Sequence, residues 1–162
     1  MLTDTLCTRC GLCCDGTLLG DVELTGRREA TRLAALGLDV DGDDADVDVL
    51  ALPCTGLCGT RCAVYAHRPQ ACRTFECRLL QDARRGAIGV DDALKAITRA
   101  RARAGRVRAL LPRRGSGLPL AEQVAAALAA SAGHSSPAAR RRTRLRRAVT
   151  AWQRAIRGTF LD

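Results

Sequence analysis

Four cysteines lie within the eight residues from Cys7 to Cys14, and the last two of them are adjacent. Cys7, Cys10 and Cys13 follow a two-residue spacing that recurs in zinc and iron–sulfur sites, because it brings thiolates around one centre. Neighbouring side chains usually diverge. We therefore expect Cys14 to point elsewhere: toward a second metal, toward a wall of the site, or toward no ligand.

A second group of cysteines follows some forty residues later. Its members are Cys54, Cys58, Cys62, Cys72 and Cys77. A closed metal site takes about four ligands, so the two groups either complete one buried centre together or fill two. On one regular helix, Cys72 and Cys77 would point about 140° apart, so they serve different atoms or the helix ends between them. Either arrangement favours a cluster or a two-centre site over a simple four-cysteine finger.

The cysteine content also bears on the redox state. All nine cysteines lie before residue 78, and nine is an odd number that a closed disulfide framework does not use. The first residues lack the basic and apolar regions of a secretory signal, and no apolar run is long enough to span a membrane. We therefore expect a cytoplasmic protein, whose thiols are ligands or redox groups rather than disulfides. The alternative, buried thiols acting as small hydrophobes, fits the clustering poorly.

The two cysteine motifs together resemble those of a known family. Cys-x2-Cys-x2-Cys-Cys near the start, followed by "CAVYAHRPQACRTFEC", resembles the YkgJ-type cysteine-cluster (CxxCxxCC) family, described as a zinc- or iron-chelating domain, over about residues 7–80. The resemblance implies an Arg-Pro pair at Arg68 and Pro69 and leaves Cys58 as an extra cysteine. The metal ligands that it implies are Cys7, Cys10, Cys13, Cys14, Cys54, Cys62, Cys72 and Cys77.

The sequence leaves the identity of the metal open between zinc and iron, because an all-thiolate set suits either. Similar cysteine segments occur in flagellin lysine-methylating proteins, where an iron–sulfur cluster is implied. We favour an iron–sulfur cluster slightly over Zn²⁺, since eight thiolates with a Cys-Cys step exceed what one zinc uses. Cys58 is either a spare ligand or a bystander, and His67 is an alternative ligand. Arg68 and Arg73 flank Cys72, where they either lower thiol pKa values or form surface ion pairs.

Charge divides the chain where the cysteines end. Residues 1–77 hold 7 Arg and 12 acidic residues, a balance of −5, whereas residues 78–162 hold 18 Arg, one Lys and five acidic residues, a balance of +14. This asymmetry indicates two parts: a cysteine-cluster metal-binding module at 1–86 and a basic α-helical C-terminal region at 87–162. The first part has few large apolar side chains, and small domains of that kind commonly need a staple, which a metal supplies.

The periodicity predicts a mostly α fold, in which a small irregular cysteine-rich module precedes an arginine-rich helical segment. We expect a ligand loop at 1–20, strand-like residues at the end of 39–52 and a short strand at 62–65. An EF-hand starting at Asp39 is excluded, because it would need Gly at position 44 and Glu at position 50, where the chain has Asp44 and Leu50. Helices are expected at 24–37, from an N-cap at Thr25, and at 69–85, 90–105, 119–131 and 138–159, with breaks at 112–119 and 132–137.

The last of these helices is amphipathic. Its apolar stripe, within an arc of about 80°, comprises Leu145, Val149, Trp152, Ile156 and Phe160, and the opposite side carries Arg140, Arg144, Arg147 and Arg154. We interpret the arginines first as a solvated outer face. Contact with an anion or RNA, or with a protein partner, is the alternative, and no aromatic interleaving or recognition motif accompanies it.

The sequence therefore predicts a protein that binds a metal centre as a structural or redox module, with the metal ion as its main partner. Two other classes stay open. One is a metal-dependent enzyme that uses an open cluster position, for example to modify a protein. The other is a metal chaperone, which would give up its ion readily to a chelator. No Ser/His/Asp set, phosphate loop or acid–base pair points to a particular reaction.

Overall fold

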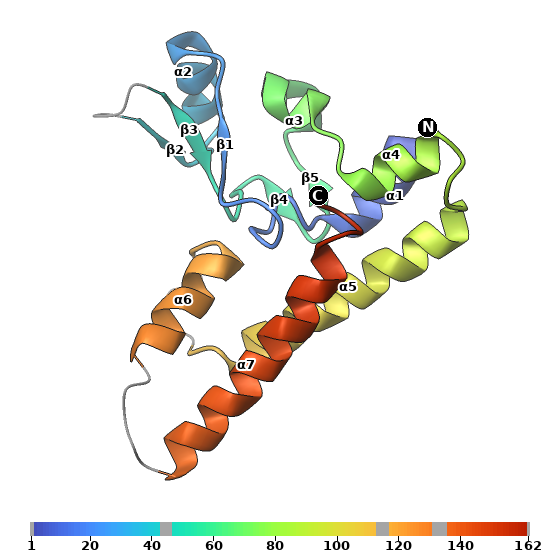
Figure 1. The fold of residues 1–162 in the computed structure, drawn as a ribbon. Helices are drawn as coiled ribbons and strands as arrows, with labels where there is room; N and C mark the ends of the chain where they lie inside the picture. Colours follow the sequence, from blue (N-terminus) through green and yellow to red (C-terminus); the bar gives the residue numbers. More distant parts are fainter. Residues whose placement is uncertain (1, 43–46, 113–116, 131–135, 162) are drawn as a thin grey trace.

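The computed structural model describes residues 2–42, 47–112, 117–130 and 136–161. The chain is mostly helical, as predicted (Figure 1). Its α-helices are α1 (Leu2–Cys10), α2 (Arg27–Ala35), α3 (Gln70–Thr74), α4 (Arg78–Arg84), α5 (Val90–Leu110), α6 (Leu120–Ala130) and α7 (Ser136–Ile156). Its strands are β1 (Asp21–Glu23), β2 (Val40–Asp41), β3 (Val49–Ala51), β4 (Leu57–Cys58) and β5 (Arg61–Cys62), and a 3₁₀ turn covers Tyr65–His67.

The two long helices, α5 and α7, lie side by side and run in opposite directions, with α6 beside them (Figure 1). The apolar stripe predicted for the last helix is confirmed: Leu145, Val149, Trp152, Ile156 and Phe160 are all buried. α7 itself ends at Ile156, and Phe160 follows after a turn at Gly158, whose φ is +73°. The four predicted outer arginines are exposed.

The larger core joins both halves of the chain. Leu6 of α1, Leu12 and two leucines of α4, Leu79 and Leu80, are buried together with the stripes of α5, α6 and α7. A second, smaller core lies under α2 and the strands and consists of Leu24, Ala30, Leu33, Leu38 and Leu50. The cysteine-bearing half is therefore anchored to the long helices through α1 and α4, whereas its sheet region has a small core of its own.

The sheet region is antiparallel and short. Its strands follow the order β1-β3-β2, with Leu50 of β3 opposite both Val22 and Val40. β4 and β5 form a separate two-stranded hairpin. The strand-like end of 39–52 is confirmed by β2 and β3, while residues 43–46 of the excluded calcium loop lie outside the described residues.

The N-terminal segment differs from the prediction. Residues 1–20 were expected to form a loop, but residues 2–10 form α1. Leu6 is the buried residue of this helix. The helix is followed by Gly11, whose φ of +68° suits the residue after a helix end. A Cβ at Gly11 would stand 3.2 Å from the Cα of Thr60, so the hairpin turn packs directly on this helix end.

The helix predicted at 69–85 is two helices. α3 ends at Thr74, Phe75 has an extended backbone (φ −65°, ψ 126°), and α4 starts after Cys77. Cys72 and Cys77 are therefore on different helices, one of the two alternatives that the sequence left open. α4 ends just before Gly86, as predicted.

The ends of several other strands and helices differ from the predicted positions. The strand predicted at 62–65 stops at Cys62, because the chain turns into the 3₁₀ segment at Tyr65. α2 begins after Gly26 rather than at a Thr25 cap, although the Thr25 N–H donates a 2.8 Å hydrogen bond to Glu29 Oε2. α5 continues through Gly105 to Leu110, because Val107 extends its buried stripe.

The remaining breaks lie partly outside the described residues, which exclude 113–116 and 131–135. α6 begins at Leu120, after Pro119, close to the predicted position. None of the described helices has both the length and the apolarity of a membrane span.

Candidate metal centre

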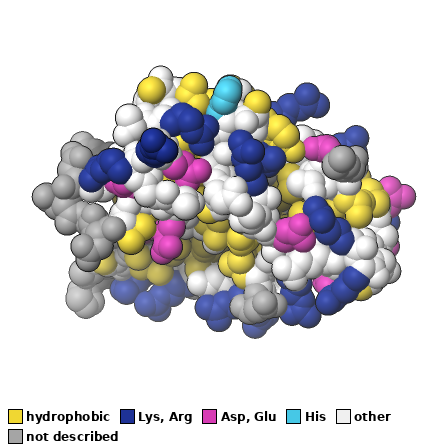
Figure 2. All heavy atoms as spheres, turned by 90° about the horizontal axis from the view of Figure 1, so that it is seen from above, with side chains coloured by type: hydrophobic (Ala, Val, Ile, Leu, Met, Phe, Trp, Pro, Cys, Tyr) yellow, Lys and Arg dark blue, Asp and Glu magenta, His cyan; other side chains and the backbone are white. Residues whose placement is uncertain are grey.

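A cavity of about 450 Å³ lies where α1, α3, α4 and the strands meet. All eight predicted ligands are among the residues that line it: Cys7, Cys10, Cys13, Cys14, Cys54, Cys62, Cys72 and Cys77. All of them are free thiols. Figure 2 shows hydrophobic side chains, the class in which it colours cysteine, between charged ones on the face above this region. The two doubtful candidates, Cys58 and His67, are exposed and are not among the lining residues.

Four of the thiols come from helical surroundings, and we call them the first set: Cys7, Cys10, Cys13 and Cys77. Cys7 and Cys10 are one turn apart on α1, Cys13 lies in the turn after this helix, and Cys77 is the N-cap of α4. α1 and α4 contact each other and bury Leu6 and Leu79 in the larger core. The main core therefore holds the elements that carry the first set.

The other four, the second set, come from less regular segments: Cys14, Cys54, Cys62 and Cys72. Cys62 ends the β4–β5 hairpin, Cys72 is on the five-residue helix α3, and Cys14 and Cys54 lie in turns. The Cys54 N–H donates a 2.8 Å hydrogen bond to the Cys14 carbonyl, which ties the two turns together. Cys54 also packs against the smaller core.

The electrostatic interactions between the thiols define these two sets. The pKa values of Cys7, Cys10 and Cys13 are raised mainly by burial and further by repulsion from one another and from Cys77. In the second set the pKa values of Cys14, Cys54 and Cys72 are raised mainly by burial, and further by repulsion from one another and from Cys62. Among the main interactions of the described thiols, one pair crosses between the sets, and it is the adjacent pair Cys13 and Cys14.

Raised pKa values keep Cys10, Cys13, Cys14 and Cys72 protonated near neutral pH. Burial, with smaller repulsion from nearby thiols, raises the pKa of Cys10 and Cys14 to about 12 and that of Cys72 to about 11. The pKa of Cys13 is raised furthest, by burial and then by Cys10. A metal ion would remove this cost, because it stabilises the thiolates that burial and mutual repulsion disfavour.

All eight thiols line one cavity. No three His, Cys, Asp or Glu side chains within the described ranges already stand in a geometry that would hold a metal. The donor chemistry nevertheless fits one: four thiols per set match the ligand number of a tetrahedral zinc site and of an iron–sulfur cluster. The ligand assignment stays a prediction.

One arginine lies near both sets. The positive charge of Arg68 acts to lower the pKa of Cys7 in the first set and of Cys72 in the second, and its guanidinium lies 3.7 Å from the centroid of the Tyr65 ring. Arg73 donates hydrogen bonds to the carbonyls of Ala66 and Arg68, and it is not among the main charges that act on Cys7 and Cys72. Of the two predicted cations, Arg68 is the one placed to offset thiolate charge.

Sequence reasoning missed two supporting residues on α5. Arg101 donates a 2.7 Å hydrogen bond to the Cys10 carbonyl. Arg108 donates to the Asp15 carbonyl (3.1 Å) and to Thr17 Oγ1 (2.7 Å), and lies 3.2 Å from Asp15 Oδ2. Their spacing of seven residues places both on one helix face. This spacing could have identified them in the sequence, but many other arginines of the chain have similar spacings.

The comparison with family models gives one match. Residues 6–93, more than half of the chain, match the family model CxxCxxCC, whose description is "Putative zinc- or iron-chelating domain". The chain belongs to the CxxCxxCC family. The match contains all eight cavity cysteines and ends within α5. No curated protein and no solved structure matches the chain.

Proposed function

We propose that this CxxCxxCC protein binds two metal centres, each held by four cysteine thiolates, as a structural or redox module. The observation that carries the proposal is the division of the eight cavity thiols into two sets of four with the boundary between Cys13 and Cys14. The division accounts for the adjacent cysteines of the family motif. Because neighbouring side chains diverge, each member of the pair serves a different centre.

The donor sets are compatible with zinc and with iron. Four thiolates close a structural zinc site, and four also hold a [2Fe–2S] or [4Fe–4S] cluster. The slight preference for iron–sulfur rested on eight thiolates being too many for one zinc, and two zinc ions meet that point equally. Metal identity therefore follows from analysis of the protein purified without oxygen: two zinc per chain, or iron with acid-labile sulfide and visible absorption.

A structural role is supported by the small core of the sheet region. Among the residues that the structure describes, five buried side chains form that core, and so small a region would gain much of its stability from bound metal. Cys14, Cys54, Cys62 and Cys72 join four segments around it, so one metal centre would cross-link the turn after α1, the turn after β3, the hairpin and α3.

Two substitutions of neighbouring residues test the proposal. Cys13→Ser should empty the first centre and Cys14→Ser the second, so each variant should retain half of the wild-type metal. Cys58→Ser serves as the control and should retain all of it, because this exposed cysteine does not line the cavity. Metal per chain, measured by elemental analysis of freshly purified protein, gives the result.

The proposal fails if the wild-type protein holds one centre or none. It also fails if Cys13→Ser and Cys14→Ser each lose all metal while circular dichroism shows both still folded, since that result means one shared centre. Retention of all metal by either variant would remove that cysteine from the ligand set.

A further inference from the structure

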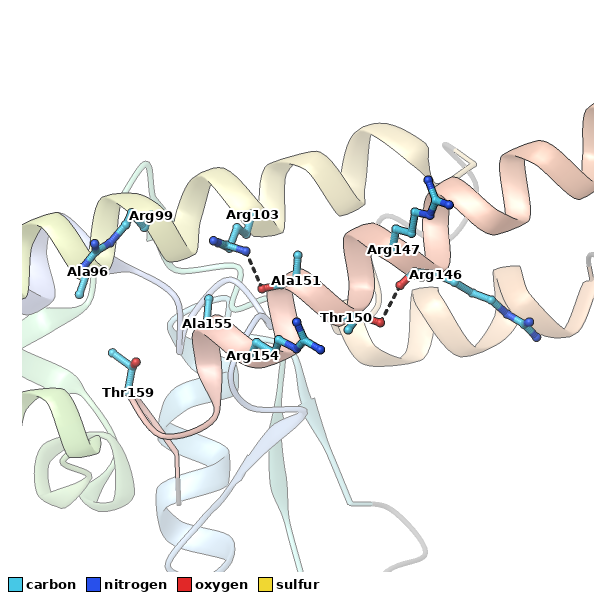
Figure 3. Close-up of a pocket in the computed structure, with 10 residues that line it drawn as sticks. All are labelled: Ala96, Arg99, Arg103, Arg146, Arg147, Thr150, Ala151, Arg154, Ala155 and Thr159. Carbon is cyan, nitrogen blue, oxygen red and sulfur yellow. Dashed lines mark hydrogen bonds between the residues drawn. The ribbon is translucent and has the colours of Figure 1, made fainter.

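The seam between α5 and α7 carries two hollows lined by arginine. The first, of about 720 Å³, is drawn in Figure 3. Its arginines are Arg99 and Arg103 from α5 and Arg146, Arg147 and Arg154 from α7. The second, of about 540 Å³, contains Arg140, Arg141 and Arg144 beside Leu110. None of the described residues that line either hollow is acidic.

The two hollows follow one another along the seam. Arg144, which lines the second, and Arg147, which lines the first, are one turn apart on α7 and both exposed. From Arg140 to Arg154, α7 rises about 21 Å. Within α7 there are seven arginines and no Asp or Glu, so like charges along this face repel one another. A polyanion lying along the seam would relieve that repulsion.

The lining chemistry restricts the kind of polyanion. Beside the arginines, the first hollow has Thr150, Thr159 and three alanines, but no aromatic side chain. Trp152, the one tryptophan of α7, is buried on the opposite side of the helix. Grooves for single-stranded nucleic acid usually add aromatic platforms on which bases stack. Arginines without such platforms suit a phosphate backbone whose bases stay paired and are not read.

We propose that the α5–α7 seam binds the phosphate backbone of double-stranded DNA without sequence preference. Arginine guanidinium groups donate charge-assisted hydrogen bonds to phosphate oxygens. Figure 3 shows Arg103 directed at α7, where its Nη1 donates a 3.1 Å hydrogen bond to the Ala151 carbonyl. That bond fixes one cation in the seam and links the two helices.

This inference is independent of the metal centres. The cavity with the eight thiols and the two arginine-lined hollows share no lining residue. A failure to bind DNA would therefore leave the proposed metal function untouched, and the reverse is also true.

The test is binding of the full-length, metal-replete protein to two 20-base-pair DNA duplexes of unrelated sequence at several salt concentrations. If the five arginines of the first hollow each neutralise one phosphate, log K should fall with log salt with a slope of about −4.5. Raising salt from 50 to 200 mM should then weaken binding about 500-fold. Both duplexes should bind equally.

Paired variants locate the surface. Arg147→Gln/Arg154→Gln should flatten the slope to about −2.7, because two phosphate contacts are lost. The control Arg28→Gln/Arg85→Gln removes two exposed arginines elsewhere (Arg85 is ion-paired with Asp82 on α4) and should leave the slope unchanged. Glutamine keeps helix propensity close to that of arginine, so melting curves and metal content should match the wild type in both double variants.

Several results would overturn the proposal: no binding of the wild type at 50 mM salt, or equal loss in the seam and control variants. Tighter binding of a single strand or an RNA duplex than of DNA would overturn the assignment to duplex DNA. Tighter binding of polyglutamate or of vesicles containing anionic lipid would do the same, and would assign the seam to an acidic protein or a membrane surface.

Discussion

The two thiol sets occupy one cavity, but different parts of the fold hold them. The first set is carried by α1, α4 and the turn between Gly11 and Cys13, and the larger core packs directly behind these elements. The second set is carried by two turns, a hairpin and the short helix α3, with the five-residue smaller core beside them. Packing therefore prepositions the first set, whereas little packing holds the second.

This difference separates two roles that one cysteine motif can serve. Where hydrophobic packing already places the thiols, a metal adds chemistry or modest stability to a formed structure. Where packing is scarce, metal-binding free energy becomes folding free energy. The step from Cys13 to Cys14 joins the well-packed region to the sparsely packed region within one peptide unit.

Substitution of one ligand in each set should give the largest effect and the clearest contrast. Cys72→Ser should destabilise the sheet region by about 4 kcal/mol or more, the size typical of losing a metal site, and lower Tm by about 8–16 °C. Cys10→Ser should cost about 2 kcal/mol, because Leu6, Leu79 and Leu80 still hold α1 and α4. Thermal unfolding followed by circular dichroism measures both.

Amide hydrogen exchange identifies the residues that each substitution destabilises. Residues 21–74 should lose protection in Cys72→Ser, while α5 and α7 keep theirs in both variants. Equal melting temperatures for the two variants would contradict the contrast between the sets, and an unchanged melting curve for both would contradict the structural role of the metal. Cys58→Ser is the matched control.

Substitution of a ligand should affect the second set more, but acidification should remove the metal of the first set earlier. Protons compete with metal for thiolates, so the set whose thiols have the higher pKa values releases its metal at the higher pH. In the first set the pKa of Cys13 is raised furthest and that of Cys10 lies at about 12, whereas in the second set the pKa of Cys14 lies at about 12 and that of Cys72 at about 11. The first set should therefore lose its metal first as pH falls.

Single-site variants make this measurable. Cys14→Ser reports on the first set alone and Cys13→Ser on the second, and metal release into a coloured chelator is followed from pH 8 downward. Simultaneous release, or earlier release from the second set, would contradict the ranking. For metal-free folded protein the sign is reversed: the raised pKa values keep the native thiols neutral, so stability falls as pH rises above 9.0 toward about 12.

The sequence identified the cysteines that line the cavity, but it did not predict how they group. Spacing alone singled out Cys7, Cys10 and Cys13, and the family resemblance supplied the remaining ligands while leaving Cys58 aside; the structure agrees by placing that residue outside the cavity. The sequence also left open that Cys14 serves a second centre. It did not predict that Cys77 joins the first set, because this depends on the chain break at Phe75 between α3 and α4.

The same contrast explains which elements could be predicted. The stripe of α7 repeats over four buried residues of the helix, from Leu145 to Ile156, so its period is strong and the predicted burial of the stripe is confirmed. α1 buries one residue, Leu6, among polar neighbours and cysteines, so its nine residues carry too little period to distinguish a helix from a loop. Tertiary packing against α4 and α5 decides its structure, and packing of that kind is not visible in local sequence.

The smallest expected effect concerns how α5 supports the boundary between the two sets. Arg108 contacts Asp15 and Thr17, which follow the Cys13–Cys14 step directly. Arg108→Gln should lower stability by about 1 kcal/mol, since charged hydrogen bonds contribute about 1.5–3 kcal/mol and partial exposure reduces that value. Both metals should stay bound, but exchange of the amides at 11–17 should accelerate, and a chelator should remove both metals faster.

The control is Arg106→Gln, an exposed position on the same helix. If Arg108→Gln accelerates release from only one set, then Asp15 and Thr17 brace one cysteine of the pair rather than the step between them. Unchanged release from both sets would show that the turn is held by its own backbone hydrogen bonds, from the Thr17 and Leu18 N–H groups to the Leu12 carbonyl. In that case α5 would support α1 through apolar packing alone, and the two sets would be coupled only through the peptide unit that joins them.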